Sequence, residues 1–151
     1  MTNLSILEQT RRDHEILNQE MGKLKIIIWQ EIADRDFADW RLDCMWQLRD
    51  FRNCLLKHFD LEEEGGFMVD LLRVAAHEEH KINELKNEHD KMIALLDEIL
   101  NSFKELQAKD SARLEKSRTS VNELIQMLRK HENEEHNLLQ RTYYREYGGP
   151  A

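Results

Sequence analysis

Two pairs of residues have a spacing that could hold a metal ion between helices. In each pair a glutamate follows a histidine by four residues: Glu62 follows His58, and Glu135 follows His131. Residues four apart on a helix lie on one face, one turn apart. The imidazole and the carboxylate of a pair can therefore reach the same ion. A carboxylate has two oxygens, so each glutamate could also bridge to a second ion.

The spacing alone is a weak signal, because His80 and Glu84 form a third such pair. His80 precedes His89 by nine residues, which is ~180° around a helix at ~100° per residue, so it should face solvent. His77 lies ~120° from His89 by the same pitch. His136 directly follows a residue of the second pair and should point sideways. We expect none of His77, His80 and His136 to bind metal.

Four long segments with helical periodicity position these side chains. We expect helices at about residues 3–33, 40–64, 76–108 and 111–144 of a single domain that spans residues 1–151. Short turns between such helices predict an all-α fold, an up-down-up-down antiparallel four-helix bundle. Each helix carries one histidine on its apolar face, and two helices also carry a glutamate there. Buried charge is costly unless it is paired or bound to metal. The predicted metal ligands in the core are His14, His58, Glu62, His89, His131 and Glu135.

The composition supports helices and excludes several classes of partner. One proline, five glycines and 34% charged residues are typical of solvated helices. A formal net charge of −8 argues against nucleic acid, which requires a basic surface. The longest strongly apolar run, residues 26–29, is far shorter than the ~20 residues of a membrane span. We also see no apolar signal-peptide region near the N-terminus and expect none.

The two cysteines favour a reducing compartment. Cys44 and Cys54 lie ten residues apart on one predicted helix. At ~1.5 Å rise per residue they are ~15 Å apart, too far for a disulfide with each other. We therefore expect free thiols and a cytoplasmic location.

The types of ligand limit the metal without naming it. Imidazole and carboxylate without thiolate suit iron, and also zinc or manganese. A ferritin-like di-iron site would need Glu-x-x-His on two helices. That string is absent from the sequence, which excludes the ferritin-like alternative.

At this point the sequence resembles the hemerythrin-like, or HHE cation-binding, family. The resembling segments span nearly the whole chain: Asp13-His14-Glu15, HFDLEEEGGFM at residues 58–68, EHDKMIALLDEI at residues 88–99 and HENEEH at residues 131–136. The resemblance implies two iron ions in an oxo- or hydroxo-bridged non-haem centre. It implies that Glu62 and Glu135 bridge the ions. It also implies that His14 and His58 face one iron, and His89 and His131 the other.

The chain departs from the oxygen-carrying members of that family on the third helix. They place a His-x-x-x-His pair there, whereas Ile93 follows His89 by four residues in this chain. The fifth histidine is missing, so we expect more open coordination and a role other than reversible oxygen carriage. Glu88 and Glu132 lie beside ligand histidines and could fill the gap, although each is ~100° away from its apolar face.

We expect a protein that binds or senses a small diatomic ligand, O2 or NO, or that handles iron. Binding is expected rather than catalysis, because no separate nucleophile, acid–base pair or substrate pocket can be identified. One alternative is a di-iron redox enzyme that consumes peroxide or nitric oxide through open coordination positions. Another alternative is a non-catalytic, partner-binding helical bundle whose polar core is incidental.

Overall fold

The computed structural model describes residues 3–146, and the side chains of residues 8–143. Four long helices form the body: α1 (Asn3–Ile28), α2 (Phe37–Glu63), α4 (Glu79–Glu105) and α5 (Ser111–Glu146). A short helix, α3 (Phe67–Val74), and two 3-10 turns, η1 (Asp34–Asp36) and η2 (Ala76–Glu78), connect them. The described residues contain no strand, so the predicted all-α class is confirmed.

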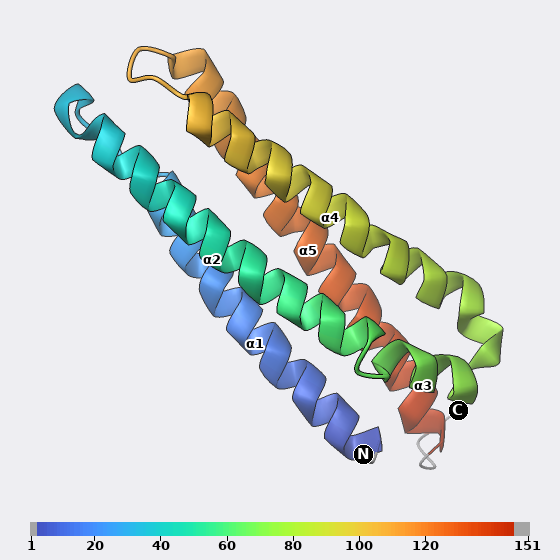
Figure 1. Ribbon diagram of the computed structural model, residues 1–151. Coiled ribbons are helices and arrows are strands. Elements are labelled where there is room, and N and C mark those ends of the chain that lie inside the picture. Colours follow the sequence, from blue (N-terminus) through green and yellow to red (C-terminus); the bar gives the residue numbers. More distant parts are fainter. Residues whose placement is uncertain (1–2, 147–151) are drawn as a thin grey trace.

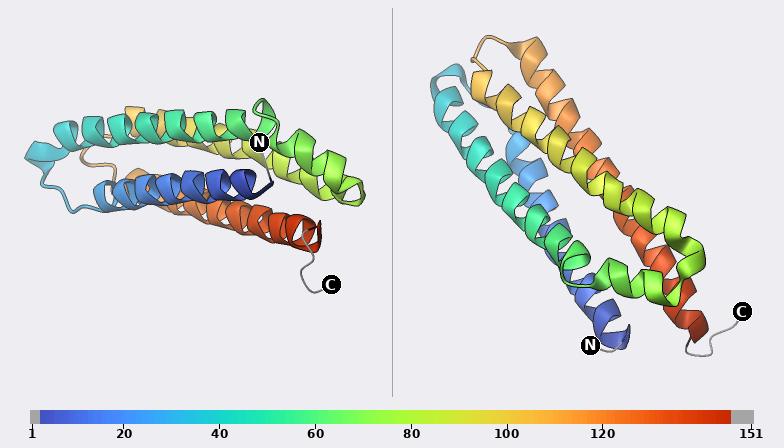
Figure 2. Two further views of the ribbon diagram at one scale, coloured as in Figure 1. Left: turned by 90° about the horizontal axis from the view of Figure 1, so that it is seen from below. Right: turned by 45° about the vertical axis from the view of Figure 1, so that its right-hand side comes forward.

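The long helices pack in a ring, in which α1 contacts α2, α2 contacts α4, α4 contacts α5, and α5 contacts α1. The α1–α2 and α4–α5 connections lie at one end of the molecule, and α3 lies at the other end with the start of α1 (Figure 1). The left view of Figure 2 shows two layers, with α2 and α4 above α1 and α5. No helix in the described part of the chain is long and apolar enough to cross a membrane.

Two apolar clusters fill the interior of the bundle. The larger cluster joins all four long helices and includes Phe51, Leu55 and Phe59 of α2. A smaller cluster lies under α3 and includes Phe67, Leu85 and Leu138, from α3, α4 and α5. Buried polar residues of α4 and α5 lie between the two clusters in sequence. The interior therefore has a polar layer with apolar packing on both sides.

The first helix ends five residues earlier than the periodicity predicts, at Ile28 rather than near Ala33. Arg118 of α5 provides the reason. Its Nε donates to the Ile28 carbonyl at 2.8 Å, and its Nη2 donates to the Gln30 carbonyl at 2.5 Å. Helix carbonyls at a C-terminus lack partners within the helix, and a side chain from a distant part of the chain satisfies them here.

Glycine ends the second helix, as the sequence predicts. Gly66 has φ of 90°, a left-handed conformation that costs other residues energy and glycine little. A Cβ at Gly65 would collide with the backbone carbonyl of Leu61. The two glycines therefore allow the sharp turn from α2 into α3, and α3 then covers that end of the bundle (Figure 1).

Three other predicted boundaries shift by a few residues. Helix α2 begins at Phe37, not near residue 40, because η1 leads directly into it. The third long helix begins at Glu79, since η2 occupies residues 76–78. It ends at Glu105, where Arg41 of α2 donates to the Lys104 carbonyl at 2.7 Å. The fourth long helix begins at Ser111 as predicted.

Candidate metal centre

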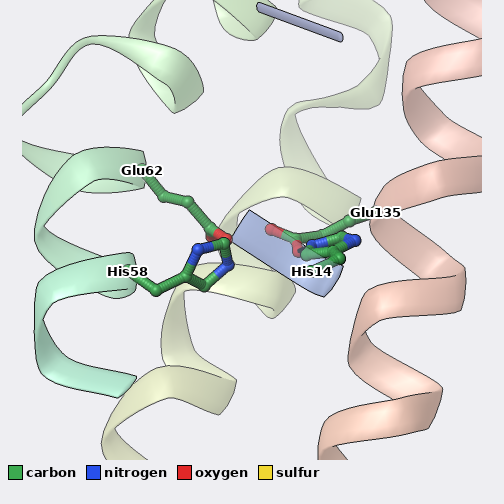
Figure 3. A group of neighbouring side chains, drawn as sticks. All are labelled: His14, His58, Glu62 and Glu135. Carbon is green, nitrogen blue, oxygen red and sulfur yellow. Dashed lines mark hydrogen bonds and ion pairs between the residues drawn. The ribbon is translucent and has the colours of Figure 1, made fainter. Parts of the chain in front are cut away.

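The six predicted ligands converge in the polar layer of the bundle. Five of them are buried, and His14 is half-buried. His14 comes from α1, His58 and Glu62 from α2, His89 from α4, and His131 and Glu135 from α5. Figure 3 shows His58 and Glu62 on one helix facing His14 and Glu135 across the interior. The helical faces identified in the sequence therefore meet in one place.

The six residues divide into two sets that have both glutamates in common. His14, His58, Glu62 and Glu135 offer ligand atoms that all lie within 4.8 Å of one another. Glu62, His89, His131 and Glu135 offer a second set within the same limit. Two overlapping sets of nitrogen and oxygen atoms are the arrangement that a pair of ions with shared carboxylates requires.

Each shared glutamate directs its two oxygens to different sets. Glu62 Oε1 lies 2.5 Å from His58 Nε2, and Glu62 Oε2 lies 3.0 Å from His89 Nε2. Glu135 Oε1 lies 3.1 Å from His14 Nε2, and Glu135 Oε2 lies 3.6 Å from His131 Nε2. All four Nε2 atoms therefore face a shared carboxylate, and each carboxylate spans the two halves of the site.

Several of these buried atoms lie close to a nitrogen or oxygen of a neighbouring side chain, but have no partner in hydrogen-bond geometry among the described residues. They include both ring nitrogens of His58, both oxygens of Glu62, Nε2 of His89 and of His131, and Oε2 of Glu135. Buried polar atoms without partners are rare and costly. A metal ion would satisfy a cluster of this kind, and its imidazole and carboxylate atoms suit iron, zinc or manganese. The residues present therefore fit a metal centre.

The two shared carboxyl groups have opposite electrostatic settings. Burial raises the pKa of Glu62 well above its usual value, and the charge of Glu135 adds to this effect. Burial acts in the same direction on Glu135, but its close contacts with His131, His14 and Glu62 hold its pKa well below the usual value. Glu62 therefore holds a proton more strongly than Glu135 does, as expected where two carboxyl groups lie close together.

The protons on the imidazoles are also affected by the carboxylates. Burial alone would lower the pKa of His131, but hydrogen bonds and charges from Glu135, Glu62 and Glu88 raise it to about 9. At neutral pH the metal-free protein therefore holds a proton on His131, where a metal would bind. Ligands must lose such protons before they can coordinate.

The three histidines excluded by the face argument lie away from the site. His77, His80 and His136 are all exposed. Glu88 and Glu132, the two possible additional ligands, belong to neither set of ligand atoms. Glu88 instead contacts the outward nitrogen of His131, with Oε1 3.0 Å from Nδ1.

Sequence reasoning missed two neighbours of the site. The Phe59 ring stacks on the His89 ring, with centroids 3.8 Å apart and planes at 10°. Glu63 Oε2 accepts a hydrogen bond from His89 Nδ1 at 2.9 Å. In the sequence Phe59 looks like any other apolar residue of the core, so no local signal identifies it as a neighbour of the site. Glu63 had one signal, since it directly follows a ligand in sequence.

A cleft of about 270 Å³ gives one half of the site access to solvent. It lies between the first turns of α1, the end of α2 and the start of α3. Of the six predicted ligands, the cleft contacts His58 and Glu62 only. Its lining is Gln9, Thr10, Asp13, His58, Leu61, Glu62, Gly65, Gly66, Phe67 and Asp70.

Comparison with known proteins agrees with the geometry of the site. A family model described as the hemerythrin HHE cation-binding domain matches residues 5–143, nearly the whole chain. Searches of curated proteins and of solved structures found no significant match. The matched segment contains all six convergent residues, the whole of α2 and α4, and all of α1 and α5 except the first residues of α1 and the last residues of α5. The chain therefore belongs to the hemerythrin HHE cation-binding domain family.

Proposed function

We propose that the protein is a single-domain, non-haem di-iron protein of up-down-up-down topology that binds or senses O2 or NO, or handles iron. Its ligands are His14, His58, Glu62, His89, His131 and Glu135. One observation carries the proposal: Glu62 and Glu135 each direct one oxygen to either set of imidazoles. A site for a single ion would not need two glutamates with this divided geometry.

The choice of iron among the possible metals rests on family membership. The donor atoms alone also suit zinc and manganese, whereas the matching family is named for hemerythrin and cation binding. When bound, a ferrous pair supplies electrons and an open coordination position for a diatomic ligand. The chain's own part is to hold the four imidazoles inward, and to keep the pair buried between two apolar clusters.

The cleft beside His58 and Glu62 supports a small ligand that enters from solvent. Position 93, four residues after His89, is a half-buried isoleucine that packs against the larger apolar cluster. No fifth imidazole is therefore available at that position to complete the coordination. Both features favour exchange of ligands at the site over a closed structural metal. Two free cysteines are consistent with the proposed cytoplasmic location.

Metal analysis and absorption spectroscopy test the proposal together. Protein purified without oxygen should contain about two irons per chain. On exposure to oxygen it should gain oxo-to-iron charge-transfer absorption in the near ultraviolet, and nitric oxide should change the spectrum of the ferrous protein. Removal of metal should lower the melting temperature, because an ion bound only by the folded state stabilises it.

The third histidine–glutamate pair provides a matched control. His58→Ala should release metal, whereas His80→Ala, which alters an exposed pair of the same spacing, should retain two irons. A protein that holds no metal after careful reconstitution, or that loses metal equally in both variants, would refute the proposal. Steady-state turnover of peroxide or nitric oxide would instead identify a di-iron redox enzyme.

A further inference from the structure

Four carboxylates outside the proposed ligand set contact the outer ring nitrogen, Nδ1, of a proposed ligand histidine on a neighbouring helix. Each directly precedes or follows a proposed ligand, and each long helix contributes one. We call this set the outer carboxylates: Asp13 in α1, Glu63 in α2, Glu88 in α4 and Glu132 in α5. A residue next to an inward-facing one is rotated ~100° around the helix, so it points toward a neighbouring helix rather than into the centre.

Two outer carboxylates hydrogen-bond the imidazole of the next helix in the ring. Glu63 of α2 accepts from His89 Nδ1 at 2.9 Å, and Glu88 of α4 accepts from His131 Nδ1 at 3.0 Å. An ionised carboxylate can only accept, so Nδ1 carries the proton. In the neutral ring, the form that binds metal, the lone pair is then on Nε2, the atom that faces the shared glutamates.

The other two outer carboxylates make longer contacts of the same kind. Asp13 of α1 places Oδ2 3.6 Å from His58 Nδ1, and Glu132 of α5 places Oε2 4.0 Å from His14 Nδ1. The four contacts follow the ring of helices once around, from α1 to α2, α4, α5 and back to α1. Hydrogen-bond distances are thus found only at His89 and His131.

Carboxylates that accept from the outer nitrogen of a ligating imidazole fix its orientation and raise its basicity. We propose that Glu63 and Glu88 are positioning residues that make the His89–His131 position the tighter of the two metal positions, and the first to fill. This inference rests on the proposed metal function. It adds an order of binding, and it assigns that order to two residues outside the ligand set.

Burial and packing point to the same asymmetry. All four members of the Glu62, His89, His131 and Glu135 set are buried, whereas His14 in the other set is half-buried. Phe59 stacks on His89 with centroids 3.8 Å apart, whereas the centroids of His58 and His131 lie 6.0 and 6.1 Å from that of Phe59. The solvent cleft contacts the His58 side only. The His89–His131 position is therefore held by packing and hydrogen bonds before any ion arrives.

A calorimetric and spectroscopic titration with Co²⁺ tests the proposal. Metal-free full-length protein should bind two ions in two resolved steps, and each step should add visible absorption that reports its coordination geometry. His89→Ala should abolish the tighter step, and His14→Ala the weaker one, which assigns the steps. Glu63→Ala and Glu88→Ala should each weaken the tighter step about 10- to 100-fold, and Asp13→Ala should change only the weaker step.

Two further variants separate positioning from a general structural role. Glu88→Gln retains an oxygen that can accept from Nδ1, so it should recover much of the affinity and the wild-type spectrum of the first ion. Glu84→Ala removes an exposed carboxylate one turn earlier on α4 and should leave both steps unchanged. A merely structural role would lower the melting temperature in Glu88→Ala without changing the affinity or spectrum of the first ion, and would overturn the proposal.

The remaining outcomes distinguish this proposal from the proposed function. If the wild-type protein binds two ions but Glu63→Ala and Glu88→Ala keep the wild-type order and affinities, the positioning role is refuted and the metal centre stands. If both binding steps weaken equally in these two variants, the positioning role is likewise refuted and the metal centre stands. If the wild-type protein binds no Co²⁺, the proposed metal centre fails and this inference fails with it.

Discussion

Phe59 should influence metal binding although it offers no ligand atom. Its side chain is 3% exposed, and its ring lies parallel to that of His89 at a centroid distance of 3.8 Å. It also meets the His131 ring edge-on at 6.1 Å. One apolar side chain thus holds the ring plane of the proposed ligand His89 by stacking. Replacing it should affect stability and metal affinity through separate physical effects.

The size of each effect follows from these contacts. Phe59→Ala leaves a large cavity and should cost about 3–5 kcal/mol of unfolding free energy. For a chain of this size, that lowers the melting temperature by about 6–20 °C. Phe59→Leu keeps most of the volume and should cost about 1.5 kcal/mol or less. It still removes the ring contact with His89, worth about 0.5–1.5 kcal/mol, which corresponds to about a 2- to 10-fold loss of metal affinity.

Phe51→Leu is the matched control for Phe59→Leu. Phe51 is fully buried in the same helix and the same apolar cluster, but no ring contact joins it to a site histidine among the described residues. Thermal melting of the metal-free variants measures the packing cost, and Zn²⁺ titration against a chelating dye measures the affinity. Both variants should lose similar stability, and only Phe59→Leu should lose affinity. Equal affinities in the two variants would refute the role assigned to the ring.

The remaining predictions concern protons, thiols and the turn after α2. Metal must displace the proton from His131, whose pKa is raised to about 9 by neighbouring carboxylates although burial opposes this. Raising the pH from 7 to 8 should therefore increase the apparent Zn²⁺ affinity by about tenfold per proton released. An affinity that does not change with pH would contradict this prediction. The raised pKa of His131 also stabilises the metal-free fold. This stabilisation is fully present below pH 6.5 and is lost as the pH rises through about 9. Burial raises the pKa of Cys44 to about 12. Iodoacetamide at pH 8 should therefore modify half-buried Cys54 faster than Cys44 in the folded protein, and peptide mass spectrometry measures both rates. Equal rates of modification would indicate that α2 opens. Gly65→Ala should lower the free energy of unfolding by about 1–3 kcal/mol, because the new Cβ would collide with the backbone carbonyl of Leu61. Urea denaturation measures this change. An unchanged midpoint of the urea unfolding transition would show that the turn can adjust.

The sequence by itself was enough to identify the fold class and the six convergent residues. Helical periodicity is a local property, and it places residues three and four apart on one face. The same rule correctly separated the exposed His80 from the buried His89 on one helix. Glycine signals at residues 65–66 likewise located the end of α2, because a left-handed backbone conformation depends on a single residue.

Contacts between helices required the tertiary structure. The end of α1 depends on Arg118, which lies 90 residues later in the chain and bonds the Ile28 carbonyl. Periodicity continued past Ile28, so no local signal could place that end. Family membership added the expectation of paired iron ions, which the types of donor atom had left open.

The roles of the outer carboxylates were likewise decided only by the packing of neighbouring helices. From sequence, Glu88 was a possible extra ligand, but the structure directs its carboxylate to the outer nitrogen of His131 on the next helix. Periodicity gives the face on which a side chain lies, but not which neighbour it meets. That neighbour depends on the relative rotation and register of two helices, which the packing of the whole core determines.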